Sequence, residues 1–95
     1  YSVDIGVVYD RKNGSNIPKE IDFVVNDVDK KLYIQSAFQM DTTVKEDSEI
    51  KSLMLTKDFF KKIVVRLDIP HNYYDDNGIF HCNLIDFLLG KIELF

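Results

Sequence analysis

The chain has 95 residues, of which 45% are hydrophobic, and this is enough for one domain with a single core. It carries 12 lysine and arginine residues against 16 aspartate and glutamate residues, and the net charge of −4 means that a nucleic-acid partner would require a local basic patch. The single cysteine, Cys82, excludes an intrachain disulfide and favours a reducing compartment. With no apolar run of membrane-spanning length and no signal peptide, we predict one cytoplasmic domain over residues 1–95, without a membrane partner.

Residues 1–9 predict a strand, because every second residue from Tyr1 to Tyr9 is apolar. This alternation is typical of a strand with one buried face, so we expect the row to lie in the core. The chain enters this pattern without an initiating methionine. We therefore expect it to be a fragment of a longer protein.

The second strand, residues 20–25, is expected to pair with the first. A two-residue turn at Asn13-Gly14 would place the acidic Asp22 opposite an apolar residue. A register shifted by one residue instead places Gly6 opposite Asp22, where the missing side chain leaves room for the carboxylate; Gly6 would equally suit a bend in the strand. We therefore expect a loop of odd length or a bulge within residues 11–18.

A polar turn over residues 27–30 joins the second strand to a third, residues 32–38. Aspartate at the first position of this turn favours type I geometry. In the resulting register Asp22 faces Gln35, and the opposite face of the strand pair is apolar. One carboxylate and one amide are therefore expected side by side on the same sheet face.

The later segments predict an alternation of helices and strands. A capping box at residues 43–46 and an apolar stripe indicate an amphipathic helix, which we expect on the face of Phe23 and Ile34. The stripe comprises Val44, Ile50, Leu53 and Met54. The next strand should then run parallel to the third. Asn83 is a plausible N-cap of the last helix, which ends at Gly90. The predicted segments are a helix over 42–56, a strand over 62–67, a polar loop over 68–77, a strand over 79–82 and a helix over 84–89. The order βββαββα indicates an α/β or α+β fold with a mixed sheet of about five strands.

Three segments carry a family resemblance. They are Lys19-Glu-Ile-Asp-Phe-Val24, Tyr33-Ile-Gln-Ser-Ala37 and Gly78-Ile-Phe-His-Cys-Asn-Leu-Ile-Asp-Phe-Leu-Leu-Gly90. Across nearly the whole chain the sequence resembles the C-terminal PD-(D/E)XK nuclease-like domain of unknown function found on bacterial and archaeal AAA-family ATPases. The resemblance implies a restriction-endonuclease-like core lacking its N-terminal helix, and a chain that is the C-terminal part of a longer ATPase.

The same resemblance implies a site. In this fold an aspartate on one strand, and a glutamate or glutamine two residues before a lysine on the next, hold a divalent metal and a catalytic water. The position-matched residues are Asp22 and Gln35, and Ala37 stands at the lysine position. Asp22 would bind Mg²⁺ only if the site were active, because one carboxylate, a neutral amide and no cation make a weak site even with Glu20 and Asp4 nearby. We expect the site to be vestigial.

Two other clusters are weighed as sites. Four residues have types that zinc accepts, but their spacing matches no compact zinc motif, and loop solvation is the preferred interpretation. They are His71, Asp75, Asp76 and His81. A basic and aromatic group is expected to cap a helix and bury its rings. It comprises Lys57, Phe59, Phe60, Lys61 and Lys62. Cys82 is expected to be a small core residue.

The predicted function is that of a degenerate nuclease-like accessory domain of an AAA-family ATPase, acting in binding, docking or regulation. An active Mg²⁺-dependent nuclease and a structural self-association domain are the alternatives. Self-association follows from an apolar face that needs cover from an upstream helix, another domain or a second copy. This face comprises Val8, Val24, Tyr33 and Ala37. The expected partners are the parent ATPase domain and a second copy of the chain, and no cofactor is expected unless Mg²⁺ supports cleavage.

Overall fold

The computed structural model describes residues 2–37 and 43–94. For residues 43–46 it describes the backbone but not the side chains. Within this part the protein is a mixed six-stranded sheet with two helices, in the order βββαβββα. The elements are β1 (Ser2–Lys12), β2 (Ser15–Asp27), β3 (Lys30–Ser36), α1 (Thr43–Met54), β4 (Lys61–Arg66), β5 (Tyr73–Tyr74), β6 (Phe80–Asn83) and α2 (Leu84–Leu88). The predicted mixed α+β class is confirmed. The sheet has six strands rather than about five, because residues 73–74 of the predicted polar loop form the short strand β5, which pairs with β6.

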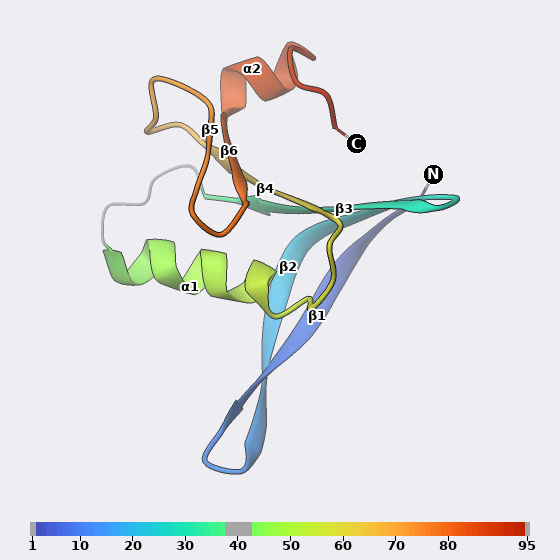
Figure 1. The fold of residues 1–95 in the computed structure, drawn as a ribbon, viewed down its shortest axis with the longest axis vertical. Coiled ribbons are helices and arrows are strands. Elements are labelled where there is room, and N and C mark those ends of the chain that lie inside the picture. The colour runs from blue at the N-terminus through green and yellow to red at the C-terminus, as the bar shows by residue number, and fades with distance from the viewer. Residues whose placement is uncertain (1, 38–42, 95) are drawn as a thin grey trace.

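Strands β1 and β2 form a long hairpin that projects past α1 as an arm (Figure 1). Its turn is the two-residue Asn13-Gly14, with φ of 51° and 79°. Both values lie in the left-handed region that asparagine and glycine tolerate and that tight hairpin turns need. Lys12 therefore pairs with Ser15, and the expected odd loop or bulge within residues 11–18 is wrong.

The irregularity lies farther along the hairpin, between Asp4 and Gly6. Gly6 pairs with Ile21 rather than with Asp22, whereas Asp4 pairs with Val24, so the register moves by one residue between these two pairs. Ile21 and Val24 both pack into the core on the α1 side, which normal alternation over three residues would not allow. A Cβ on Gly6 would lie 2.7 Å from Cγ2 of Val24, so the glycine makes room for two core side chains rather than for a carboxylate.

The β2–β3 register is the one predicted, with Phe23 opposite Ile34. The turn itself differs, because Val28 has φ of 36° and type I geometry needs a negative value. Two-residue turns with positive φ match the twist of the flanking strands better than type I turns do. Both kinds of turn connect Asp27 to Lys30 through two residues, so the predicted register is the same. The predicted parallel pairing of β3 with the strand after α1 is confirmed.

Helix α1 packs on the sheet face opposite to the one predicted. Its Leu53 joins a buried cluster that lies on the α1 side. The strand and loop members of this cluster are Ile21, Val24, Tyr33, Ala37, Val64 and Ile79. An ion pair of 2.8 Å between Lys51 Nζ and Asp10 Oδ2 also ties α1 to β1. The predicted apolar stripe is wrong at Met54, which is exposed, while Val44 and the capping box lie outside the described side chains.

This packing corrects the expectation of an uncovered face on β1, β2 and β3. Val24, Tyr33 and Ala37 are buried, and Val8 packs against them, because α1 covers them. The helix could have taken either face, since β3 and β4 are apolar on both. Alternation along the strands therefore did not indicate which side α1 would choose.

The second sheet face is covered by α2 and the segment after it, which contribute Leu84, Phe87 and Ile92 to a second cluster. The Asn83 side chain accepts a hydrogen bond from Ile85 N at 2.8 Å, so the predicted N-cap is confirmed. Because α2 has only five residues and contacts β4 and β6, it does not reach along β1. The row from Val3 to Tyr9, expected in the core, is therefore exposed; Tyr1 lies outside the described residues.

No helix within the described residues is long and apolar enough to cross a membrane.

Candidate functional site

The side chain of Gln35 replaces backbone hydrogen bonds where the β2–β3 pairing ends. Gln35 is 2% exposed; its Oε1 accepts from Asp22 N at 2.8 Å and its Nε2 donates to Glu20 O at 3.2 Å. An amide can do both because it has a donor and an acceptor, whereas an ionised glutamate only accepts. The neutral side chain at this position is therefore explained by its structural bonds to β2.

The carboxylate of Asp22 turns toward Ser36. Its Oδ2 accepts hydrogen bonds from Ser36 N at 2.8 Å and Ser36 Oγ at 2.9 Å. Ser36 lines the α2 side of the sheet with Phe23, whereas Gln35 alternates with it and points to the α1 side. The bulge sends Asp22 and Phe23 to the same side, so the expectation that Asp22 and Gln35 share a face is wrong.

The lysine position of the predicted site lies inside the core. Ala37 is buried in the α1-side cluster, and its N–H donates to Val65 O at 2.8 Å. The described part of the chain contains no group of three or more His, Cys, Asp or Glu residues placed to hold a metal ion. Asp22 and Gln35 are thus brought close in the backbone, while their functional groups bond in different directions.

No model of a known protein family matches the chain, and neither a curated protein nor a solved structure matches it. Membership of the nuclease-like family therefore stays a proposal. What the domain can bind or catalyse is therefore inferred from the arrangement of its own side chains.

The most buried polar network joins β4 to β6. His81 is fully buried, with Nε2 2.7 Å from Asp75 Oδ2 and Nδ1 3.2 Å from Arg66 Nη1. Because an arginine nitrogen only donates, Nδ1 accepts and the ring proton lies on Nε2, where it is donated to Asp75. Arg66 also donates to both carboxylate oxygens of Asp68, and the ring of Tyr73 stacks on His81 with centroids 4.6 Å apart.

This network fixes the β5–β6 hairpin rather than a ligand. Asp75 Oδ1 accepts from Asn77 N at 2.8 Å and from Ile79 N at 3.0 Å, so one carboxylate organises the whole turn. Both ring nitrogens of His81 are occupied, and the preferred interpretation of loop solvation is therefore wrong for His81 and Asp75, which form a structural bridge. His71 and Asp76 are exposed to solvent. Sequence analysis missed Arg66, because a charge at a strand end does not reveal a buried partner.

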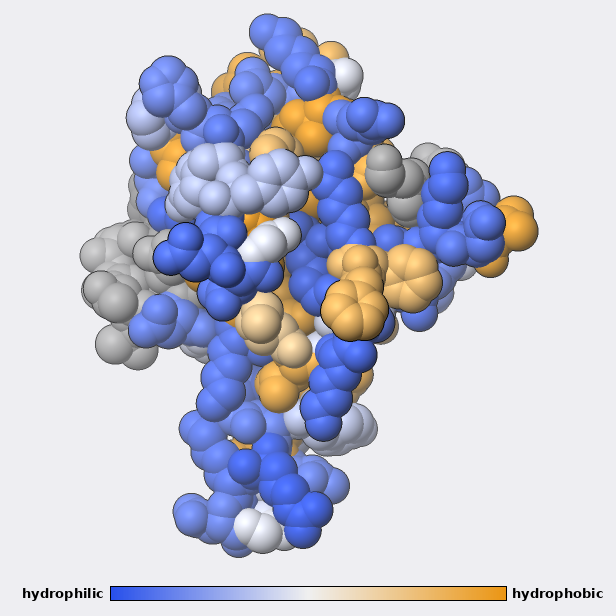
Figure 2. Space-filling model, in the orientation of Figure 1, coloured by the Kyte–Doolittle hydropathy of each residue, from blue (hydrophilic) through white to orange (hydrophobic). Residues whose placement is uncertain are grey.

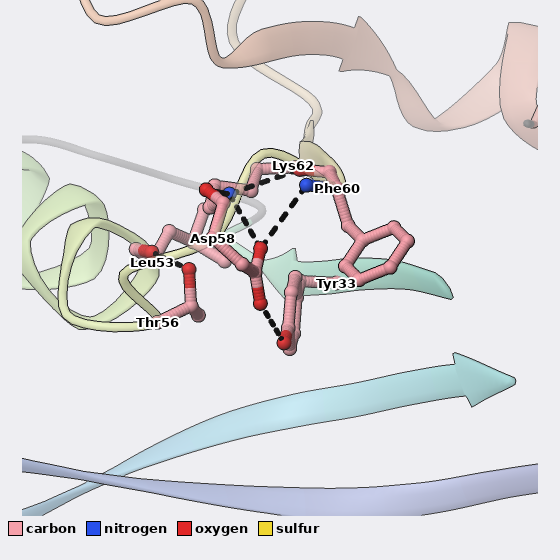
Figure 3. Close-up of polar contacts among 6 residues, drawn as sticks. All are labelled: Tyr33, Leu53, Thr56, Asp58, Phe60 and Lys62. Carbon is pink, nitrogen blue, oxygen red and sulfur yellow. Dashed lines mark hydrogen bonds and ion pairs between the residues drawn. The ribbon is translucent and has the colours of Figure 1, made fainter. Parts of the chain in front are cut away.

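A second polar network, shown in Figure 3, stabilises the turn between α1 and β4. Asp58 Oδ2 accepts from Tyr33 Oη at 2.5 Å, and Asp58 Oδ1 accepts from Lys62 Nζ at 3.2 Å and Phe60 N at 3.1 Å. These bonds make Asp58 the centre of a bridge from the middle of the sheet to the turn. Lys62 also lies 5.5 Å from the centroid of the Tyr33 ring.

The two rings of the basic and aromatic group lie on the surface. Phe59 is fully exposed and Phe60 is exposed as well, so the expected burial of these rings is wrong. Lys57 has φ of 58°, and Asp58 is held by Tyr33 and Lys62, so the next residues point outward. The two rings line a shallow hollow with basic residues and one aspartate. These are Asp29, Lys30, Lys31 and Lys61.

An apolar cavity of about 290 Å³ opens beside α2, on the sheet face opposite to the one that α1 covers. Its walls include Val3 of β1, Phe23 of β2 and Leu88 of α2, all three partly exposed. The cavity therefore continues into the exposed row of β1. Cys82 is buried in the core on this side; burial raises the pKa of its thiol to about 11, as expected for an unreactive core residue.

The two networks predict a loss of stability at both ends of the pH range. Burial disfavours the carboxylates of Asp58 and Asp75, but hydrogen bonds from Tyr33, Lys62, His81 and backbone N–H groups outweigh it and lower the pKa of each. Stability contributed by a carboxyl with a lowered pKa is present above its unfolded value, near 4, and is lost as pH falls further. Burial, with the Asp58 hydrogen bond, raises the pKa of Tyr33, so its contribution is lost as pH rises above about 10.

The measurement is the urea midpoint of unfolding at about pH 3, 7 and 10.5. The wild type should show its highest midpoint near neutrality. Asp75→Asn should flatten the acid side, and Tyr33→Phe should flatten the alkaline side. A Tyr33→Phe variant that keeps the wild-type alkaline slope would contradict the role given to this pair.

Proposed function

We propose that this domain is a nuclease-like scaffold that has lost catalysis and serves as a docking module. The observation that carries the proposal is the use of every predicted catalytic position by the fold. Gln35 bonds the β2 backbone, Asp22 bonds Ser36, and Ala37 fills the core. Metal-dependent cleavage needs several convergent carboxylate oxygens and a cation or general acid near the reacting phosphate. Here one oxygen of Asp22 is held by Ser36, Gln35 is a neutral amide and Ala37 carries no functional group.

The docking role is supported by apolar surface that the domain leaves open. The exposed row of β1 is continuous with the cavity beside α2, and soluble proteins seldom expose such connected apolar area without a partner. Figure 2 shows hydrophilic side chains at the far end of the hairpin and apolar side chains between hydrophilic ones on the body. Docking to protein also agrees with the net charge of −4.

The identity of the larger assembly rests on the sequence resemblance. It leads us to propose a restriction-endonuclease-like core, joined to or working with a cytoplasmic AAA-family ATPase. The order of an antiparallel β2–β3 pair, helix α1 and a parallel β4 supports this finer fold. The ATPase would be one docking partner, beside a second copy of the chain.

We expect no cleavage of single- or double-stranded DNA or RNA by the purified domain in Mg²⁺ or Mn²⁺. The physical reason is that one oxygen of Asp22 is held by Ser36 and that the described residues place no group of three or more His, Cys, Asp or Glu side chains around a metal position. A gel assay with end-labelled substrates measures it, and Asp22→Ala serves as the matched control for contaminating nucleases.

Cleavage by the wild type that disappears in Asp22→Ala would overturn the proposal and favour the active nuclease. Cleavage that persists in Asp22→Ala would come from a contaminant. The wild type and Asp22→Ala are then purified further until the contaminating activity is gone, and the assay is repeated on both.

A further inference from the structure

Strand β1 is a free edge of the sheet. The order of the described strands places β2 on one side of it and none on the other. Its side chains from Val3 to Tyr9 on the α2 side are 51–71% exposed. A long edge strand with unpaired backbone groups and apolar side chains is a template for pairing with another strand.

We propose that β1 pairs with β1 of a second copy of the chain, as antiparallel strands related by a two-fold axis at Val8. The proposal rests on the docking role above and names a second copy as the partner of this edge. Two sheets would join into one continuous sheet. Such an interface uses the same strand twice and closes after two copies.

The backbone limits the possible registers. Because Asn13-Gly14 is a two-residue turn, Lys12 and every second residue before it direct their N–H and C=O groups toward β2. Val7, Tyr9 and Arg11 therefore direct theirs to the free edge. An antiparallel copy has to pair odd-numbered residues with odd-numbered ones, so the axis passes through a residue near the middle of the strand.

Charge selects among these axes. An axis at Val7 would place Asp4 opposite Asp10 of the second copy, and facing like charges are destabilising. An axis at Gly6 would place Asp4 opposite Val8 and leave the carboxylate without a cation.

An axis at Val8 gives favourable side-chain pairs on both faces of the sheet. Asp4 then lies opposite Lys12 of the second copy on the α1 side, and Val7 lies opposite Tyr9 on the other side. The symmetry makes each contact twice. The pairing places Val7 and Tyr9 of the two copies side by side within the apolar row, and it forms two ion pairs and a new backbone ladder.

Sedimentation velocity of the wild type from about 5 to 200 µM tests the proposal. We expect the sedimenting mass to rise toward twice the 11.1 kDa of one chain. Asp4→Lys should weaken association by about tenfold or more, because both ion pairs become like-charge contacts. The double variant Asp4→Lys with Lys12→Asp restores both pairs in reversed order and should recover association.

Asp29→Lys makes the same charge change on the exposed β2–β3 turn and should leave association unchanged. A wild type that stays monomeric would overturn the pairing, as would a double variant no better than Asp4→Lys alone. Neither result bears on catalysis, whereas cleavage by a dimeric wild type would overturn the docking role and leave the pairing intact.

Discussion

Leu53→Ala is expected to lower the free energy of unfolding by about 2 to 5 kcal/mol, the range for deleting a fully buried leucine side chain. Leu53 is 0% exposed and lies within the α1-side cluster, against which Ile50 of the same helix also packs. The loss is large for a domain of this size, whose total stability is about 5 to 14 kcal/mol. Urea unfolding followed by circular dichroism measures the change.

Met54→Ala is the matched control, because Met54 is the next residue of α1 and is 47% exposed. We expect a change of less than about 1 kcal/mol there. The contrast also reports which face of α1 meets the sheet. Equal losses at Leu53 and Met54 would contradict the packing.

Asp75→Ala is expected to lower the free energy of unfolding by about 2 to 4 kcal/mol, because buried donors lose their acceptor. The donors are His81 Nε2 and Ile79 N, and both residues are fully buried. The same substitution should release the β5–β6 turn, since Asn77 N is also bonded to this carboxylate. Hydrogen exchange at Ile79 N provides a local readout besides the urea midpoint.

Asp76→Ala is the control for the neighbouring charge. Asp76 is exposed, and its removal should change stability by no more than about 0.5 kcal/mol. Asp75→Asn should lie between these two variants. Its oxygen can still accept from backbone N–H groups, but its amide cannot serve both them and the His81 proton as well as a carboxylate does. An Asp75→Ala protein as stable as Asp76→Ala would refute the bridge.

The candidate site shows where prediction from sequence stopped. The pairing of Phe23 with Ile34 was predictable because a short turn sets the register of its flanking strands. The position of the Asp22 carboxylate was not predictable, because a bulge in the pairing of β2 with β1 turns this side chain to the α2 side of the sheet, where it bonds Ser36. The bulge brings Ile21 and Val24 together over Gly6. The glycine indicated a possible bend in β1, but it did not indicate that the bend would change the side of the sheet to which Asp22 points.

The sequence by itself determined the features that neighbouring residues encode through local hydrogen bonds and alternation. These include most strands, both helices, the Asn83 cap and the absence of a lysine at position 37. Only the tertiary structure decided which sheet face α1 covers, which row of β1 stays open and how His81 is paired. The central strands are apolar on both faces, so these choices depend on contacts between distant segments, such as Lys51 with Asp10 and Arg66 with His81.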